Sequence, residues 1–243
     1  MCSDALDDAG FQEGSLLIGI DQDKAALREA GDKLKEYDAL KIVVENKKDC
    51  PLYTGTIIRE VKVSPSPEWL RKSLELIGCR SVNNVVDITN YILFTWGEPL
   101  HAFDLDKLAA AEIIIRRAKE GERITTIDGS EKKLTPEILV IADAQKSQAV
   151  AGVMGSRDSE VSFTTKNILL EAALFDAVLI RRGRQKIGLQ SESSYRFERG
   201  IDAQTLLDAK TWAIQMILEI CGGRVISAKA SSAVKIKPAQ PFP

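Results

Sequence analysis

The sequence has almost no histidine and no long hydrophobic run. His101 is the only histidine among 243 residues, which excludes sites that need two. No apolar stretch approaches the roughly 20 residues that a membrane-spanning helix requires. The first residues, MCSDALDDAGFQEG, have neither the basic start nor the apolar core of a signal peptide. These absences predict a cytoplasmic protein that does not enter the membrane.

Motifs of cofactor and metal sites are also missing. Neither G-x-x-x-x-G-K-S/T nor G-x-G-x-x-G occurs, which argues against ATP chemistry within the chain. Cys2, Cys50, Cys79 and Cys221 lie far apart without a C-x-x-C pair, so we expect reduced, mostly buried thiols and no metal site. A net charge of -2 offers no general attraction for phosphate, so any nucleic-acid contact must come from local patches.

Helical patterns flank a block of strand patterns. Short strands are predicted over residues 40–47 and 53–63. Further strands are predicted in the block 111–175, in the runs 111–118, 122–135, 137–143, 148–155 and 167–175, with a tight hairpin turn at Asp128-Gly129. Ser66 is a candidate cap for the first amphipathic helix, and Asp176 is a candidate cap for the helix that begins at residue 177. Helices are predicted over residues 22–37, 66–78, 85–97, 177–188 and 203–223. This order indicates an α+β fold.

Three features carry possible chemistry. His101, within GEPLHAFDLDKL, can be an acid, a base or a structural hydrogen-bonding residue in a loop. The stretch AGVMGS, 151–156, can let backbone approach a ligand or can simply form a tight turn. Glu171 interrupts the apolar run NILLEAALF, where an unpaired carboxylate is costly to bury, unless the residue faces outward at a sheet edge.

Residues 181–199 concentrate positive charge. Six arginines and lysines occur there with Tyr195 and Phe197 between them, a composition suited to phosphate contacts and base stacking. A solvated basic helix face has the same composition. The pattern alone leaves both interpretations open.

Taken together, these stretches resemble one family. The block around NNVVDITNY and PLHAFD, followed by AVAGVMG, NILLEAALFD and IRRGRQKIGLQSESSYRFERGID, is similar to the editing domain in the β subunit of bacterial phenylalanyl-tRNA synthetase. The order and spacing of the blocks match over about residues 50–236. The resemblance implies a layered β/β/α sandwich that hydrolyses tRNA(Phe) mischarged with tyrosine.

The resemblance also implies a set of site residues and partners. His101, Asn90 and Gly152 are expected in the catalytic part of the pocket, and Glu171 is expected to hold the tyrosine hydroxyl. The remaining substrate-binding positions are Thr89, Ala151, Ser191 and Ser193. The partners would be the acceptor end of tRNA(Phe), the synthetase α subunit and the rest of the β subunit. No cofactor is expected here, since ATP and Mg²⁺ serve the α subunit of the whole enzyme.

This chain departs from the family pattern at three positions. Ser191 and Ser193 stand where the family usually has threonine and alanine, and Ser156 replaces a second glycine. The extra hydroxyl of Ser193 can alter tyrosine selectivity or weaken editing. A catalytically silent structural or tRNA-docking module and a free-standing aminoacyl-tRNA deacylase therefore stay as alternatives.

The chain is expected to have three parts. Residues 1–49 form an N-terminal appendage that faintly resembles the tail of a tRNA-binding module. Residues 50–236 form the editing domain. Residues 237–243, with three prolines, resemble a linker.

Overall fold

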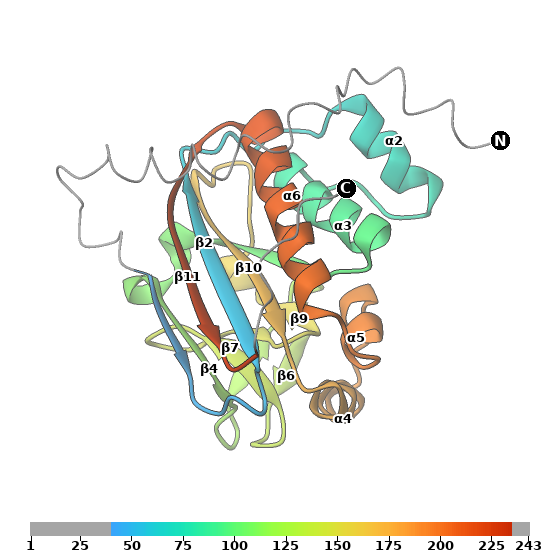
Figure 1. Cartoon of the computed structure of the whole chain (residues 1–243). Helices are drawn as coiled ribbons and strands as arrows, with labels where there is room; N and C mark the ends of the chain where they lie inside the picture. Colours follow the sequence, from blue (N-terminus) through green and yellow to red (C-terminus); the bar gives the residue numbers. More distant parts are fainter. Residues whose placement is uncertain (1–39, 235–243) are drawn as a thin grey trace. The chain divides into compact units, whose positions relative to one another are not determined.

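The computed structural model describes residues 40–234. The helix predicted over 22–37 and the linker predicted over 237–243 lie outside these residues. Within them, two main sheets, one small hairpin and five α-helices occur in an α+β arrangement, which confirms the predicted fold class (Figure 1). Each element is given below with its bounds.

The larger sheet has five strands. They lie in the order β1 (Lys41–Val44), β4 (Glu112–Arg117), β7 (Leu139–Ala142), β8 (Ser147–Val150) and β9 (Met154–Gly155). β1 pairs parallel with β4, and the other neighbours are antiparallel. A separate hairpin joins β5 (Arg123–Thr125) to β6 (Glu131–Lys133) through the predicted turn, where Gly129 has φ 84°.

The second sheet has four antiparallel strands. Their order is β11 (Arg224–Ser232), β2 (Leu52–Arg59), β10 (Asn167–Leu174) and β3 (Leu100–Asp104). β10 therefore lies inside this sheet, between β2 and β3. The outward-facing edge position considered for Glu171 is wrong, because β10 is paired on both sides.

Five helices and three short 3₁₀ turns complete the part of the fold formed by residues 40–234. The helices are α2 (Glu68–Leu76), α3 (Asn84–Trp96), α4 (Ala177–Ile187), α5 (Glu192–Phe197) and α6 (Ala203–Cys221). The 3₁₀ turns are Leu105–Lys107, Ala109–Ala111 and Arg157–Ser159. Asp176 caps α4 as predicted, but Ser66 does not cap α2, since its hydroxyl donates to Asp87.

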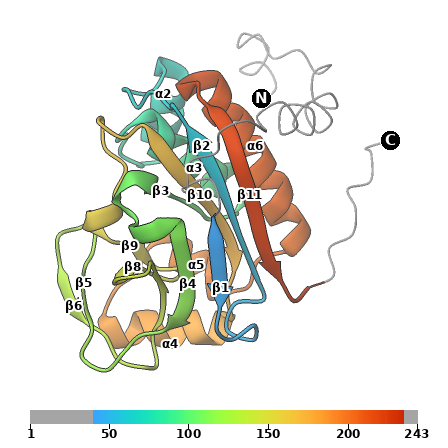
Figure 2. The ribbon, with the colours of Figure 1, turned by 90° about the vertical axis from the view of Figure 1, so that its left-hand side faces the viewer.

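The strand β10 separates two hydrophobic cores. Leu169 and Ala173 face the five-stranded sheet, whereas Ile168, Leu170 and Ala172 face the helices. Period-2 alternation of a strand buried on both faces produces this division. Figure 2 shows α3 and α6 on one side of the four-stranded sheet and the other strands on the opposite side, so the layers run β/β/α.

Three parts of the fold differ from the predicted pattern. His101 lies in strand β3 and not in a loop. The run 148–155 is not one strand: it contains the end of β8, a turn at residues 151–153 and the two-residue strand β9. The elements α5 and β11 were not predicted, and both carry few buried residues.

Candidate functional site

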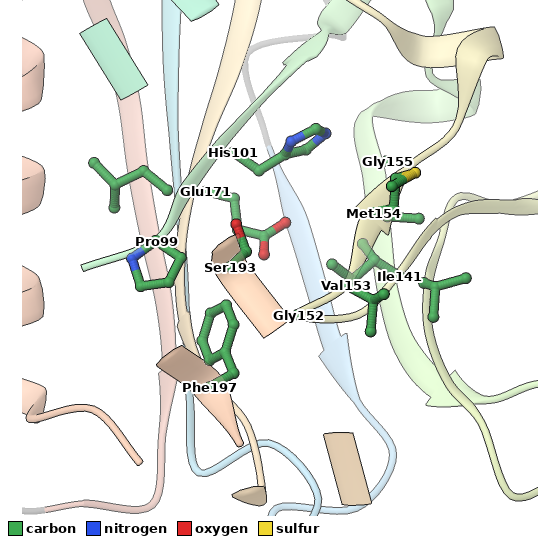
Figure 3. A pocket seen from close by; sticks show the side chains of 13 residues that line it. Pro99, His101, Ile141, Gly152, Val153, Met154, Gly155, Glu171, Ser193 and Phe197 are labelled. Atoms are coloured by element: carbon green, nitrogen blue, oxygen red, sulfur yellow. The ribbon is translucent and has the colours of Figure 1, made fainter. Parts of the chain in front are cut away.

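A pocket lies between the two main sheets and is closed by α5. It encloses about 380 Å³ of empty space, part of it open to solvent. Strands β3, β7, β8, β9 and β10, the 151–153 turn and α5 all contribute to its walls. The lining residues are Pro99, Leu100, His101, Ile141, Ala149, Val150, Gly152, Val153, Met154, Gly155, Glu171, Ser193 and Phe197 (Figure 3).

Four of the eight predicted site residues line this pocket. They are His101, Gly152, Glu171 and Ser193. Glu171 and His101 are direct partners in the antiparallel register of β10 and β3, so their side chains project from the same face of the sheet. Figure 3 shows the Glu171 carboxyl group turned into the pocket, with Ser193 beside it and Val153 and Ile141 on the opposite wall.

Glu171 is the most deeply buried of the polar side chains that line this pocket. Its side chain is 5% exposed, and burial raises its pKa to about 8, although the hydroxyl of Tyr53 donates a hydrogen bond of 3.1 Å to Oε2 and opposes that shift. At neutral pH the carboxyl group is therefore mostly protonated. A neutral carboxyl group can both donate to and accept from a ligand hydroxyl.

His101 is held by packing in a fixed position. Its ring meets Phe103 edge-on with centroids 4.4 Å apart, and burial lowers its pKa to about 4. On the other side, Gly155 lies so close that an added Cβ would be 2.6 Å from His101 Cε1. The imidazole is therefore neutral near pH 7, with one donor and one acceptor nitrogen.

The 151–153 turn brings backbone to the pocket wall. Gly152 has φ 66°, and an added Cβ would meet Ile180, Phe175 and Phe197 at 3.1–3.2 Å, so no side chain fits there. The N–H of Ala151 donates to Leu139 O at 3.0 Å and is not available to a ligand. Among residues 40–234, the N–H of Gly152 has no recorded partner.

The two serines of α5 have different positions. Ser191 caps the helix, accepting from the N–H of Ser194, and its hydroxyl donates to Val153 O at 2.7 Å. It does not line the pocket but ties the start of α5 to the glycine turn. Ser193 is the one that reaches the pocket wall.

Thr89 and Asn90 lie on α3, outside the pocket lining. The Thr89 hydroxyl donates to Val86 O at 2.7 Å within the helix. Asn90 is half-buried. The structure therefore does not bring these two residues, or the side chain of Ala151, into the cavity around Glu171.

The basic run after residue 180 is largely ion-paired. Arg184 pairs with Glu198, and Arg199 pairs with the same carboxylate at 2.8 Å. Further pairs are Lys186 with Glu137 and Arg196 with Glu192. Much of this charge is neutralised locally, which favours the solvated helix face over a phosphate-binding patch.

Sequence patterns did not indicate Tyr53 as a site residue, and they indicated Gly155 only as part of the stretch 151–156. Tyr53 is fully buried and bonds Glu171 across a separation of 118 residues. Alternation along β2 placed it in a strand, but only the register of β2 against β10 brings it to Glu171. The sequence near Tyr53 offers one sign of its role: a phenol in a strand that is expected to be buried needs a hydrogen-bond partner for its hydroxyl.

Membrane-spanning helices and metal-ligand clusters are both absent from the described part of the chain. No helix within residues 40–234 is both long and apolar enough to cross a membrane. In the same range, no three histidine, cysteine or acidic residues are grouped to hold a metal ion.

The B3/4 domain family matches residues 49–222. The chain is 50% identical to a phenylalanine–tRNA ligase beta subunit of Geobacter metallireducens, over 76% of this chain and 23% of the relative. It is 45% identical to the beta subunit of Carboxydothermus hydrogenoformans, over 86% of this chain and 27% of the relative. An N-terminal fragment of the beta subunit from Pyrococcus horikoshii has a TM-score of 0.41 at 15% identity, covering 61% of this chain and 49% of that one.

The family match over residues 49–222 defines the class of the molecule as a B3/4 domain. The chain belongs to the B3/4 domain family of phenylalanyl-tRNA synthetase beta subunits. It spans about a quarter of the length of the curated relatives it matches.

Proposed function

We propose that this domain proofreads for phenylalanyl-tRNA synthetase by hydrolysing tyrosine from mischarged tRNA(Phe). The observation that carries the proposal is the buried carboxyl group of Glu171, which faces an otherwise largely apolar pocket. Tyr53 bonds only one of its two oxygens, and the other oxygen is costly to leave without a partner. A tyrosyl ring entering this pocket would supply that partner with its own hydroxyl.

The selection works because tyrosine and phenylalanine differ by one hydroxyl. A pocket shaped for the ring cannot strongly reject an added hydroxyl, whereas a site that requires the hydroxyl can discriminate against the analogue that lacks it by about 10⁴–10⁵. Phenylalanine would leave the oxygen of Glu171 that Tyr53 does not bond without a partner. Correctly charged tRNA would thus be spared.

The ester bond would be cleaved by a positioned water. His101 is neutral at pH 7 and lies opposite Glu171, so we assign it a positioning role toward the carbonyl or the terminal ribose. The ribose hydroxyl next to the ester would assist the attacking water. The N–H of Gly152 is the backbone donor left for the developing oxyanion.

The proposed reaction needs no cofactor from this chain. ATP and Mg²⁺ would serve the charging reaction of the whole synthetase, in its α subunit. The α subunit and the rest of the β subunit would present the acceptor end of tRNA(Phe), in the cytoplasm. Asn90, which is half-buried on α3, would then contact a part of the substrate outside the cavity around Glu171, whereas the buried Thr89 and Ala151 would act only through packing.

The direct test mixes the purified chain with Tyr-tRNA(Phe) and with Phe-tRNA(Phe) and follows release of the amino acid. We expect tyrosine release well above the uncatalysed rate and little phenylalanine release. The Glu171→Ala variant should lower the tyrosine-to-phenylalanine rate ratio by roughly 5- to 150-fold, since an unmet hydrogen bond costs about 1–3 kcal/mol. Equal release of both amino acids by the unaltered chain would refute the proposal.

A second candidate function is a silent tRNA-docking module, favoured by the hydroxyl of Ser193 at the pocket wall. Ser193→Ala separates the two. If the Ser193 hydroxyl only alters the selectivity of an active editing pocket, the variant should hydrolyse Tyr-tRNA(Phe) at least as fast as the unaltered chain. If both proteins bind tRNA but release no tyrosine, the docking module is the better account. Release from other mischarged tRNAs instead would indicate a deacylase of different specificity.

A further inference from the structure

A tyrosine of the protein itself already hydrogen-bonds the carboxyl group that would recognise substrate tyrosine. Tyr53 lies on β2 and Glu171 on β10, and the Tyr53 hydroxyl donates to Oε2 at 3.1 Å. Tyr53 is fully buried and does not line the pocket. It contacts the carboxyl group from behind the pocket wall.

The strand register fixes this contact. Glu171 is opposite Gly55, and Tyr53 is opposite Ala173, so Tyr53 and Glu171 are diagonal neighbours on the inner face of the sheet. Gly55 has no side chain to separate them, and an added Cβ there would be 2.7 Å from Leu40. The phenol ring is packed in the core between the sheets, which leaves it little freedom to turn away.

We propose that Tyr53 is the positioning residue that sets tyrosine specificity, by occupying one oxygen of Glu171 and holding the other toward the pocket. This inference rests on the proposed function. With Oε2 bonded to Tyr53, the orientation of the carboxyl group is fixed, and a single oxygen remains for the ligand hydroxyl. A carboxyl group that is free to rotate would instead turn away when phenylalanine enters and would not penalise it.

The same hydrogen bond acts on the proton of Glu171. Burial raises the pKa of this carboxyl group and the bond from Tyr53 lowers it, since a phenol donor favours the ionised form. The other titratable groups nearby are His101 on the adjacent strand and the thiol of Cys50, whose pKa burial and Glu171 raise. Neither is a recorded hydrogen-bond partner of Glu171 in the described residues, so the phenol is the one group that can exert this effect directly.

The test is the Tyr53→Phe variant, which keeps the ring and removes only the hydroxyl. We expect the tyrosine-to-phenylalanine rate ratio to fall by roughly tenfold or more. The pH at which this ratio changes should rise by about one unit, because the bond that favours the ionised carboxylate is gone. Tyr91→Phe is the matched control, since Tyr91 packs against Trp69 on the helical side and should leave both measurements unchanged.

A double-variant cycle separates positioning from general loosening. In a Glu171→Ala background, which has no side-chain oxygen for Tyr53 to bond, Tyr53→Phe should change the rate ratio much less than it does in the unaltered chain. Equal effects in the two backgrounds would overturn the inference. An unchanged ratio and unchanged pH midpoint in Tyr53→Phe would also overturn it, while leaving the proposed function standing.

A measurement without substrate distinguishes failure of the proposed function from failure of the inference about Tyr53. The pH dependence of unfolding reports the Glu171 proton directly, and in Tyr53→Phe the loss of stability should extend to higher pH. If the unaltered chain releases no tyrosine, the proposed function fails on its own evidence. If the pH range over which stability is lost is the same in Tyr53→Phe as in the unaltered chain, the hydrogen bond does not control the proton of Glu171. The inference then fails, whatever the pocket binds.

Discussion

Glu171 and His101 are direct partners across the antiparallel strands β10 and β3, and both side chains line one pocket. Burial shifts their pKa values in opposite directions, to about 8 for Glu171 and about 4 for His101. Both groups are therefore mostly uncharged at neutral pH. An uncharged pair suits a site that binds an aromatic ring and positions polar atoms around it.

The raised pKa of Glu171 predicts a pH-dependent stability. The folded protein binds this proton more tightly than the unfolded chain does, so the stabilising effect is complete below about pH 4.5 and is lost as the pH rises through about 8. In Glu171→Gln this loss is absent. We expect the stability difference between the two proteins to shift in favour of the variant by several kcal/mol between about pH 5 and about pH 9.

Urea unfolding at a series of pH values measures that difference. The lowered pKa of His101 works with the opposite sign, since its contribution is lost as the pH falls from about 6.5 toward about 4. It is present in both proteins and cancels in the comparison. A stability difference that stays constant with pH would show that Glu171 titrates normally.

Gly155→Ala should displace His101. The new Cβ would be 2.6 Å from Cε1 of the imidazole, so the ring must move. Misplacement of about 1 Å can cost on the order of 100-fold in rate, and we expect tyrosine release to fall by roughly 10- to 100-fold. Gly183→Ala is the control: no heavy atom lies within 4 Å of its added Cβ in α4, so release should be unchanged. Equal rates in both variants would show that the position of His101 does not matter.

Ser191 should contribute to stability through its hydroxyl. Removing a helix cap costs about 1 kcal/mol, and Ser191→Ala also loses the bond to Val153 O. Ser191→Thr, which restores the residue usual in the family, keeps a hydroxyl and should be close to neutral. Unfolding by urea measures both, and equal losses in the two variants would contradict the capping role.

Arg116 and Glu122 form a half-buried bidentate pair with two bonds of 2.8 Å. Burial alone would raise the pKa of Glu122, but hydrogen bonds from Arg116, Ser147 and a backbone N–H outweigh it and lower the pKa to about 2. Arg116→Met would leave this carboxylate without its main partner. We expect a loss of about 3 kcal/mol at neutral pH.

The exposed pair Arg123–Glu131 is the control for that change. Its side chains are 66% and 58% exposed, and Arg123→Met should cost less than about 1 kcal/mol. The cost of Arg116→Met should shrink as the pH falls from about 4.5 toward about 2, where Glu122 becomes protonated. Similar losses of stability in Arg116→Met and Arg123→Met would mean that the half-buried pair stabilises the fold no more than the exposed pair does.

Local patterns in the sequence predicted much of the fold and part of the site. The Asp128-Gly129 hairpin and the Asp176 cap follow from rules that span a few residues, and both are present. Glu171 was identified because a carboxylate within an apolar run needs a reason. The six residues of α5 are too few to show helical periodicity, which is why that helix was missed.

The register between strands that are far apart in the sequence could not be predicted from local patterns. Nothing near Tyr53 indicates a partner 118 residues away, and the contact exists only because β2 and β10 pair as they do. The same register rejects the outward-facing position for Glu171. The predicted roles of Thr89 and Asn90 came from resemblance, and the pocket geometry gives them no place beside the carboxyl group.

The most direct test is a crystal structure of the chain with a stable amide analogue of tyrosyl-adenosine. We predict that the tyrosyl ring lies in the pocket with its hydroxyl oxygen about 2.5–3.0 Å from the free oxygen of Glu171, while Tyr53 keeps the other oxygen. A ring bound with its hydroxyl away from Glu171, or an analogue bound outside the pocket, would contradict the account.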